Sequence, residues 1–294
     1  MEILVIIVTY NGMQWIKKCL DSVRESTVRA KMFVIDNGST DGTQAFIRNN
    51  YPEIIFFQSQ QNLGFGKANN LGIRYALENN YKYVYLLNQD AWLFPETLSI
   101  MIEVSKKYQD YAILSPMQLQ GNLQHLDSNF VEYTCRFDSN RELISDFYFN
   151  SLKDIYEVDF VMAAHWLIST AVLRKIGAFS PSFPHYGEDN NLIYRAQYHG
   201  YKVGIVLAAK AVHDREDRKE TIQKKMYLIY INFLSSLSNP NEKHFLSFNL
   251  LIFIKLAIKY KSILPFKYMF DLCIHYLLIK KNRKISMVKD GAFI

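Results

Sequence analysis

Three segments of the chain carry acidic side chains whose types and spacing suit catalysis. They are Asp36-Asn37-Gly38-Ser39-Thr40-Asp41-Gly42-Thr43, Asn88-Gln89-Asp90 and Gly187-Glu188-Asp189. A carboxylate can accept a hydrogen bond, bind a divalent cation or take up a proton. Each segment therefore has its own candidate chemistry, which depends on where the fold places it.

The first segment begins with Asp36, directly after an apolar run. Asp, Asn, Gly and Ser favour turns and helix N-termini for backbone reasons alone, so a turn followed by a capped helix is one interpretation. The other is that Asp36, held at a strand end, accepts a hydrogen bond from the N3–H of a uracil or thymine base. The helix N-terminus behind it would favour anionic groups nearby.

The second segment ends with Asp90, which we expect to bind a divalent cation that neutralises a diphosphate leaving group. A simple turn at the end of a strand is the alternative. His213 follows another apolar segment, in Ala211-Val212-His213-Asp214. An imidazole there is either structural or a further metal ligand.

The third segment places two adjacent carboxylates, Glu188 and Asp189, at a predicted helix start. Acidic residues in a first turn compensate the helix dipole, which is the structural interpretation. The functional alternative is a general base that takes the proton of an acceptor hydroxyl.

The segment Asn62-Leu63-Gly64-Phe65-Gly66-Lys67-Ala68-Asn69-Asn70 contains a Gly-x-Gly pair that resembles a dinucleotide-binding turn. The third glycine position is Asn69, however, and no free acidic residue follows at the required distance. We therefore set a dehydrogenase aside.

Alternating strands and helices are predicted to position these segments. Apolar runs at 3–8, 32–35, 54–57 and 83–87 read as buried strands, and apolar stripes between them read as helices. This alternation predicts an α/β fold with a mainly parallel central sheet flanked by helices. Residues 9–11, 36–41 and 88–90 then share the carboxyl edge of the sheet, where ligands bind. Residues 118–156 lack clear periodicity and are expected to be a loop-rich insertion, and 201–206 read as a further strand.

The chain has 294 residues, enough for a large core, and its basic character is confined to its end. Residues 221–294 contain 12 Lys and Arg against 3 Asp and Glu, whereas the preceding part contains 22 against 25. We divide the chain into a catalytic domain at 1–220, with halves at about 1–115 and 116–220, and a helical C-terminal region at 221–294.

The C-terminal region includes an apolar stretch at 246–258 that is shorter than the ~20 residues of a spanning helix. Its lysines suit an interfacial helix on an anionic membrane. The alternatives are helices that pack on the catalytic domain or on a second copy of the chain, as in a homodimer. The three cysteines have no metal or redox spacing, and no basic segment precedes the first apolar run. We therefore expect a cytoplasmic protein with reduced thiols and no signal peptide.

Taken in order, the motifs resemble the family 2 glycosyltransferases, and especially their bacterial rhamnosyltransferase-like branch. The resemblance extends over roughly residues 3–215 and rests on five separate motifs. These are Val8-Thr9-Tyr10-Asn11, the segment 34–43, Asn62-Leu63-Gly64-Phe65-Gly66, Leu86-Leu87-Asn88-Gln89-Asp90 and Tyr186-Gly187-Glu188-Asp189.

The resemblance implies a GT-A fold and inverting transfer from a nucleoside-diphosphate sugar, either dTDP-rhamnose or a UDP-sugar, with Mg²⁺ or Mn²⁺. The implied acceptor is a glycan or lipid-linked glycan of a bacterial surface polysaccharide such as capsule or O-antigen, at the inner face of the cell membrane. No nucleic-acid partner is expected.

The resemblance also implies a role for each matching position. Asp189 is the catalytic base, Asp90 and His213 are the metal ligands, and Glu188 and Trp166 face the acceptor. Trp166 has a second interpretation, as a core aromatic. The implied donor-binding residues are Thr9, Tyr10, Asn11, Asp36, Asn37, Gly64, Lys67, Asn70, Asn88 and Gln89.

Three positions depart from the branch pattern. Asn88 replaces the first acidic residue of the metal motif, Asn191 replaces an acidic residue, and Met162-Ala163-Ala164-His165-Trp166 replaces a segment rich in Gly and Ala. Asn88 and Asn191 keep open the alternative of a non-catalytic scaffold. A nucleotidyltransferase is the other alternative, although residues 9–13 lack its Gly-rich loop with a basic residue.

Overall fold

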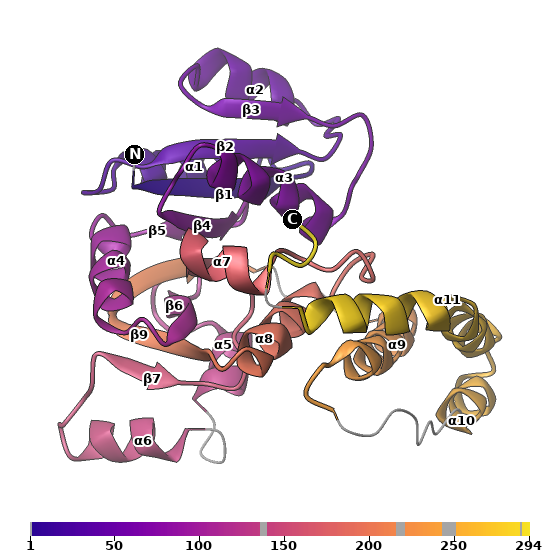
Figure 1. Ribbon diagram of the computed structural model, residues 1–294. Helices are drawn as coiled ribbons and strands as arrows, with labels where there is room; N and C mark the ends of the chain where they lie inside the picture. Colours follow the sequence, from indigo (N-terminus) through magenta and orange to yellow (C-terminus); the bar gives the residue numbers. More distant parts are fainter. Residues whose placement is uncertain (1, 136–139, 216–220, 243–250, 289) are drawn as a thin grey trace.

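The computed structural model describes residues 2–135, 140–215, 221–242, 251–288 and 290–294. Strands and helices alternate through the first part, as the sequence predicts (Figure 1). In order, these elements are β1(Ile3–Thr9), α1(Ile16–Arg24), β2(Lys31–Asp36), α2(Thr43–Asn50), β3(Ile55–Gln58), α3(Phe65–Glu78) and β4(Tyr83–Asn88).

The second part adds further strands to the same sheet and further helices around it. They are β5(Ala91–Leu93), α4(Thr97–Lys107), β6(Tyr111–Leu119), α5(Ser128–Thr134), α6(Arg141–Tyr148), β7(Ile155–Glu157), β8(His165–Ser169), α7(Thr170–Ile176), α8(Glu188–Tyr198) and β9(Lys202–His213). The sheet order is β3-β2-β1-β4-β8-β6-β9-β5, and β7 pairs with β9.

The expected α/β fold with a parallel sheet flanked by helices is confirmed. Strands β3, β2, β1 and β4 are all parallel. Antiparallel pairs enter with β8, β5 and β7, while β6 and β9 run parallel. This arrangement brings the carboxyl ends of the first four strands to one edge.

Both faces of the sheet are buried, which explains why β1 has an unbroken apolar sequence. Leu4 and Ile6 point into one core cluster, whereas Ile3, Val5 and Ile7 point into the other. Each such side chain stabilises the fold by roughly 1.5–3 kcal/mol when it is removed from water.

The expectation of a loop-rich insertion at 118–156 is wrong for the described residues. Helices α5 and α6 begin at side-chain caps, in which Asp127 accepts from the Phe130 N–H and Asn140 accepts from the Leu143 N–H. Helices of seven and eight residues are too short to show a clear apolar period in the sequence.

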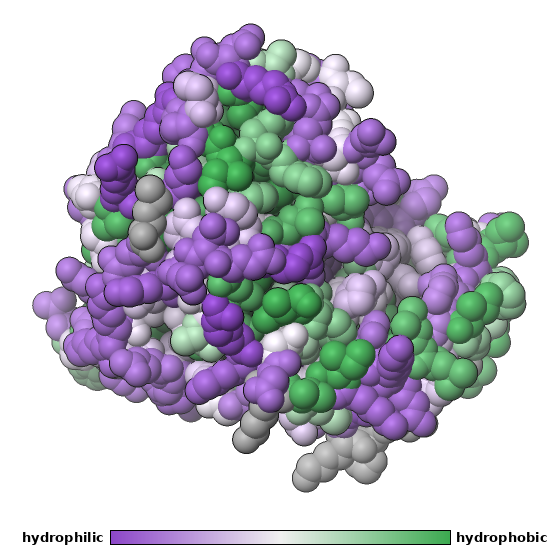
Figure 2. Space-filling model, turned by 45° about the horizontal axis from the view of Figure 1, so that its top comes forward, coloured by the Kyte–Doolittle hydropathy of each residue, from purple (hydrophilic) through white to green (hydrophobic). Residues whose placement is uncertain are grey.

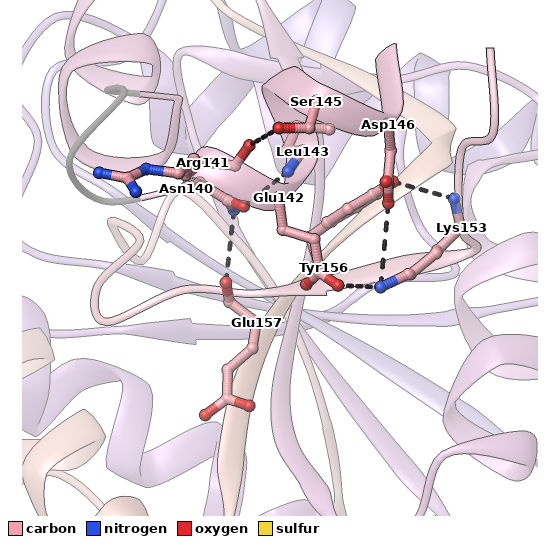
Figure 3. A network of polar contacts seen from close by, with 9 residues as sticks. All are labelled: Asn140, Arg141, Glu142, Leu143, Ser145, Asp146, Lys153, Tyr156 and Glu157. Atoms are coloured by element: carbon pink, nitrogen blue, oxygen red, sulfur yellow. Dashed lines mark hydrogen bonds and ion pairs between the residues drawn. The ribbon is translucent and has the colours of Figure 1, made fainter. Parts of the chain in front are cut away.

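A polar network ties α6 to β7 (Figure 3). Lys153 pairs with Glu142, and its Nζ lies 3.8 Å from Oδ2 of Asp146. The hydroxyl of Tyr156 donates to Asp146 at 2.8 Å and accepts from the Lys153 N–H at 3.1 Å. The network fixes α6 against the end of β7, which pairs with β9 at the periphery of the sheet.

The C-terminal region is helical in its described parts, with α9(Ile222–Ser238), α10(Leu251–Tyr260) and α11(Leu264–Ser286). These helices share an apolar cluster with Phe183, just before α8. The last residues return to the catalytic part, where the Ala178 N–H donates to the Ala292 carbonyl at 2.8 Å. Among the described residues, no helix is long and apolar enough to cross a membrane.

Candidate active site

The ends of three parallel strands bring the N-terminal polar segments together. Thr9 lies opposite Asp36 across the β1–β2 pair, and Val8 lies opposite Asn88 across the β1–β4 pair. Residues 9–11, 36–41 and 88–90 therefore share the carboxyl edge of the sheet, as expected.

Asp36 has a different role from the expected one. Its side chain has no exposed surface, and its Oδ1 accepts from the backbone N–H groups of Gly38 and Ser39 at 3.1 and 2.9 Å and from Gln44 Nε2 at 2.7 Å. Its Oδ2 accepts from the Ser39 hydroxyl. Because both oxygens are engaged inside the loop, Asp36 shapes the loop, and direct contact with a base is not available to it in this conformation.

The loop after β1 is tied to the loop after β2 by reciprocal hydrogen bonds. Asn11 Oδ1 accepts from the Thr40 N–H at 2.9 Å, and the Asn11 N–H donates to Ser39 Oγ at 2.8 Å. Asp41 accepts from the Met13 N–H at 3.0 Å. Burial raises the pKa of Asp41, but hydrogen bonds from Thr43 and from backbone N–H groups outweigh it, so the net pKa is lowered.

Gln89 joins the loop after β4 to the same structure. Its Oε1 accepts from the Thr9 hydroxyl at 2.7 Å and from the Tyr10 N–H at 2.9 Å, and its Nε2 donates to the Tyr10 carbonyl. Thr9 is fully buried, so its hydroxyl supports the edge and does not line an open pocket. The ring of Tyr10 is 48% exposed and is available to a ligand.

The two glycines of the Gly-x-Gly pair allow close packing between the two halves of the catalytic part. A Cβ at Gly64, whose φ is +78°, would lie 2.7 Å from the Pro184 carbonyl oxygen. A Cβ at Gly66 would lie 3.1 Å from Cβ of Phe179. The spacing that resembles a dinucleotide turn thus reflects contact with the segment before α8.

One of the expected donor residues near these glycines, Asn70, has a structural role. The Asn70 side chain accepts from the Phe179 N–H and donates to the Phe179 carbonyl, both at 2.9 Å, so in this structure it is buried and bonded within the protein. Asn37 is nearly buried, and its contacts to the Leu63 N–H and the Gly64 carbonyl are both long, at 3.4 Å. Lys67 is exposed on α3.

Asp90 and His213 meet through the β5–β9 pair, in which Ala91 lies opposite His213. Nε2 of His213 is 3.5 Å from Oδ1 of Asp90, and the Asp214 N–H donates to the Asp90 carbonyl at 2.8 Å. Burial raises the pKa of Asp90, but His213 and Arg215 outweigh it, so the net pKa is lowered and the carboxylate is charged at neutral pH.

Arg215 links this pair to the second half and was not identified from the sequence. Its Nε lies 3.2 Å from Nδ1 of His213 and 3.3 Å from Oδ2 of Asp127. Its positive charge contributes to the lowered pKa of Asp90, and it opposes the larger effect of burial, which raises the pKa of Asp189. The signal in the sequence was a basic residue two positions after His213 at the end of a strand.

His165 lies behind His213, with ring centroids 6.5 Å apart. It contacts the Tyr85 hydroxyl at 3.1 Å and the Val212 carbonyl at 3.0 Å. Burial lowers the pKa of His165 to about 3, so the ring is neutral and supports the strand ends.

The described residues contain no group of three or more His, Cys, Asp or Glu side chains that could hold a metal ion. Mg²⁺ commonly uses only one or two protein carboxylates and takes its other ligands from substrate phosphates and water. Asp90 fits this pattern. His213 fits less well, because Arg215 donates to Nδ1, which leaves the proton of a neutral ring on Nε2.

Glu188 and Asp189 begin α8 after two residues in the left-handed region, Tyr186 and Gly187. Burial raises the pKa of Asp189, although the Asn190 N–H at 2.8 Å opposes the shift. Burial and the charge of Asp189 raise the pKa of Glu188 to about 8, and its Oε2 has no hydrogen-bond partner. Asp189 is partly exposed, whereas Glu188 is buried.

Trp166 is a core residue, which corrects its assignment to the acceptor. The side chain has no exposed surface, it stacks on Phe179 with ring centroids 6.3 Å apart, and its indole N–H donates to the Val161 carbonyl at 3.2 Å. A fully buried indole has no face for a sugar.

Comparison with known proteins identifies relatives of this chain. The family model described as glycosyl transferase family 2 matches residues 4–177. The low-salt glycan biosynthesis hexosyltransferase Agl10 of Haloferax volcanii is 24% identical over 277 residues, which are 94% of this chain and 87% of that protein. Glycosyltransferase GlyA of Streptococcus pneumoniae is 28% identical over 112 residues, but these are 37% of this chain and 16% of GlyA.

Solved structures share the fold at low sequence identity. A fragment of S. aureus TarS solved with UDP-GlcNAc has a TM-score of 0.57 and 16% identity, and the match covers 98% of this chain and 79% of that one. The longer TarS chain has a TM-score of 0.55 and 18% identity, and the match covers 80% of this chain and 40% of that one. From the family match and the fold, the chain belongs to glycosyltransferase family 2.

Proposed function

We propose that this glycosyltransferase moves a hexosyl or deoxyhexosyl group from a nucleoside-diphosphate sugar to a hydroxyl of a glycan or lipid-linked glycan, with inversion at the anomeric carbon. The acceptor belongs to surface polysaccharide synthesis and is met at the inner face of the cell membrane. The observation that carries the proposal is the row of contacts at the end of β9, where Nε2 of His213 lies 3.5 Å from Oδ1 of Asp90 and Nδ1 of His213 lies 3.2 Å from Nε of Arg215. It places a carboxylate and a guanidinium side by side, which suits the binding of a metal ion and a diphosphate.

Asp189 is the general base. Its pKa is raised, so it binds a proton more strongly than an exposed aspartate does, and it remains partly open to solvent. It takes the proton of the acceptor hydroxyl while that oxygen bonds to the anomeric carbon and the bond from this carbon to the diphosphate oxygen breaks. A single displacement of this kind inverts the configuration.

Asp90 would hold Mg²⁺ or Mn²⁺, with His213, whose Nε2 lies 3.5 Å from Oδ1 of Asp90, as the candidate second ligand. Such an ion, when bound, neutralises the charge of the diphosphate leaving group. Arg215 carries a permanent positive charge beside the same position and supports the leaving group in the same direction.

The base of the donor is bound at the edge formed by the loops after β1, β2 and β4. The exposed ring of Tyr10 offers a stacking face. Asn37 replaces Asp36 as the candidate base reader, because its amide both donates and accepts and its present hydrogen bonds are long. The UDP-GlcNAc complex of TarS favours a UDP-sugar over dTDP-rhamnose as the first donor to test.

A screen of UDP-, dTDP- and GDP-sugars, with and without Mn²⁺, tests the proposal. Donor hydrolysis or transfer with at least one of them is expected. If none is bound or consumed by the folded full chain, the proposed function is wrong and the non-catalytic scaffold is favoured.

A further inference from the structure

The helices α10 and α11 each have two apolar faces. On α11, Leu272 and Ile279 point into the cluster shared with α9. Phe266, Phe270, Ile274 and Leu277 recur at intervals of three and four residues on the other side and are exposed. A helix on the surface of a water-soluble domain normally has a polar outer face. The exposed apolar face of α11 therefore indicates a binding surface for a partner.

The same pattern holds on α10. Phe253 and Ala257 are buried, whereas Leu251, Ile254 and Ile258 are exposed, and Ile263 between the two helices is exposed as well. Figure 2 shows hydrophobic surface interleaved with hydrophilic surface at the right-hand end of the molecule, where α10 and α11 lie in Figure 1. We refer to these exposed apolar side chains as the outer residues; they are Leu251, Ile254, Ile258, Ile263, Phe266, Phe270, Ile274 and Leu277.

The charge around the outer residues is strongly positive. Residues 251–288 contain eight Lys and Arg and a single acidic residue, Asp271. Lys255, Lys259, Lys267 and Lys281 are all exposed on the same two helices. The partner must therefore combine an apolar layer with negative charge.

A second copy of the chain does not meet this requirement. A symmetric contact places the same surface on both sides, so two strongly basic surfaces would face each other. A membrane with anionic headgroups does meet it. Lysine stems can lie along the apolar boundary while the ammonium groups reach the headgroups, and exposed Phe, Ile and Leu enter the acyl region.

We propose that the outer residues of α10 and α11 lie on the surface of a membrane that contains anionic phospholipids. The binding is peripheral, because none of the described helices can span the bilayer. The proposal extends the proposed function in one respect, since a lipid-linked acceptor would be met at that surface.

Co-sedimentation of the full chain with vesicles tests this inference. Binding to vesicles of phosphatidylcholine mixed with phosphatidylglycerol is expected, with much weaker binding to phosphatidylcholine alone and a decrease as salt rises. The double variant Phe270→Ser/Leu277→Ser should lose binding. The matched control is Phe147→Ser/Phe149→Ser, which removes two exposed phenylalanines from the region of α6 and should bind like the unchanged chain.

A double charge reversal tests the electrostatic part of vesicle binding independently, because it leaves the apolar side chains in place. Lys255→Glu/Lys281→Glu should weaken binding by about fivefold or more for each residue. The control Arg29→Glu/Lys82→Glu makes the same change in net charge outside the C-terminal helices and should have little effect. Circular dichroism and thermal melting show whether each variant is folded.

Absence of binding to anionic vesicles by the unchanged chain overturns the inference, as does equal loss in a matched control. If sedimentation analysis instead reveals a dimer that Phe270→Ser/Leu277→Ser dissociates, and the chain does not bind vesicles, a second copy of the chain is favoured as the partner. Donor binding is measured separately in solution without vesicles. A chain that binds no donor but still binds anionic vesicles contradicts the proposed function and supports the membrane-binding surface.

Discussion

Nε2 of His213 faces Oδ1 of Asp90 at 3.5 Å, across the antiparallel pair of β5 and β9. The other ring nitrogen is held by Arg215 at 3.2 Å. In this arrangement Nε2 of His213 faces the carboxylate of Asp90 and orients it. Asp90 is thus the primary candidate for metal binding, and His213 acts first as its positioning partner.

Because Asp90 is the primary candidate ligand and His213 its positioning partner, we expect a larger effect from mutation of Asp90 than from mutation of His213. Asp90→Asn should reduce transfer by at least about 100-fold and abolish stimulation by Mn²⁺, because it removes the carboxylate ligand. His213→Gln should weaken the apparent affinity for Mn²⁺ by about 10- to 100-fold, as loss of a supporting residue does. Both effects are measured by Mn²⁺ titration of the transfer rate.

Asp110→Asn is a suitable control, since Asp110 forms an exposed ion pair with Lys202 at 3.3 Å, outside the site. It should leave the titration unchanged. Equal losses in Asp90→Asn and His213→Gln would contradict the assigned order, and activity that a chelator does not affect would contradict the metal itself.

The base assignment predicts a separation between binding and turnover. Asp189→Asn should lower kcat by about 10²- to 10⁴-fold while the Kd of the donor stays within about twofold, since general base catalysis contributes in this range. Isothermal titration with the donor and steady-state kinetics measure the two quantities. Unchanged turnover would refute the role of Asp189.

The raised pKa of Asp189 also fixes the sign of the pH dependence. A base acts only when it is deprotonated, so kcat/KM should fall as the pH decreases through that pKa. The acid limb should lie above the ordinary range of an aspartate. Arg215→Gln removes a charge that lowers this pKa, so it should move the limb to still higher pH.

Much of the fold follows from local sequence signals. Unbroken apolar runs such as Ile3–Val8 predict strands covered on both faces, and helices between them predict parallel pairing. The insertion at 118–156 was not predictable in this way. Its helices begin at Asp127 and Asn140, and each is too short for a period to be recognised.

The position of the polar segments at the strand ends could be predicted from the sequence, but the contacts that each side chain makes could not. Asp36, Asn70 and Trp166 carry residue types suited to ligands, yet each is buried and satisfied by the protein itself. Burial depends on contacts between distant segments, such as Asn70 with Phe179, and spacing along the chain does not contain that information. Arg215 was missed for the same reason, since Asp127 meets it only in the fold.

Mutation can separate the structural role of Asp36 in its loop from the proposed stacking of the donor base on Tyr10. Asp36→Asn places an amide where donors converge, so it should lower the free energy of unfolding by about 1–3 kcal/mol and also weaken donor binding. Tyr10→Ala should weaken donor binding by about 5- to 150-fold, as expected for loss of base stacking, without a change in stability.

Urea denaturation and donor titration distinguish these outcomes. Asn37→Ala should resemble Tyr10→Ala if its amide reads the base. A stable Asp36→Asn variant that has lost donor binding would restore Asp36 as the direct contact.

The final prediction concerns Glu188, whose pKa is raised from 4.5 to about 8 by burial and by Asp189. The folded state then binds a proton that the unfolded state releases at lower pH. The stabilising effect is fully present below pH 4.5, decreases as the pH rises, and is lost at about pH 8. Glu188→Gln mimics the protonated form, so its free energy of unfolding should decrease less than that of the unchanged chain over this range.

Urea denaturation at several pH values measures this difference. Glu78→Gln, an exposed position at the end of α3, is the control and should retain the slope of the unchanged chain. Transfer activity of Glu188→Gln near neutral pH should stay within a few-fold of the unchanged enzyme, because Glu188 is already protonated there. An identical slope in Glu188→Gln and the unchanged chain would mean that Glu188 is charged in the folded state, and that a partner or water satisfies its Oε2.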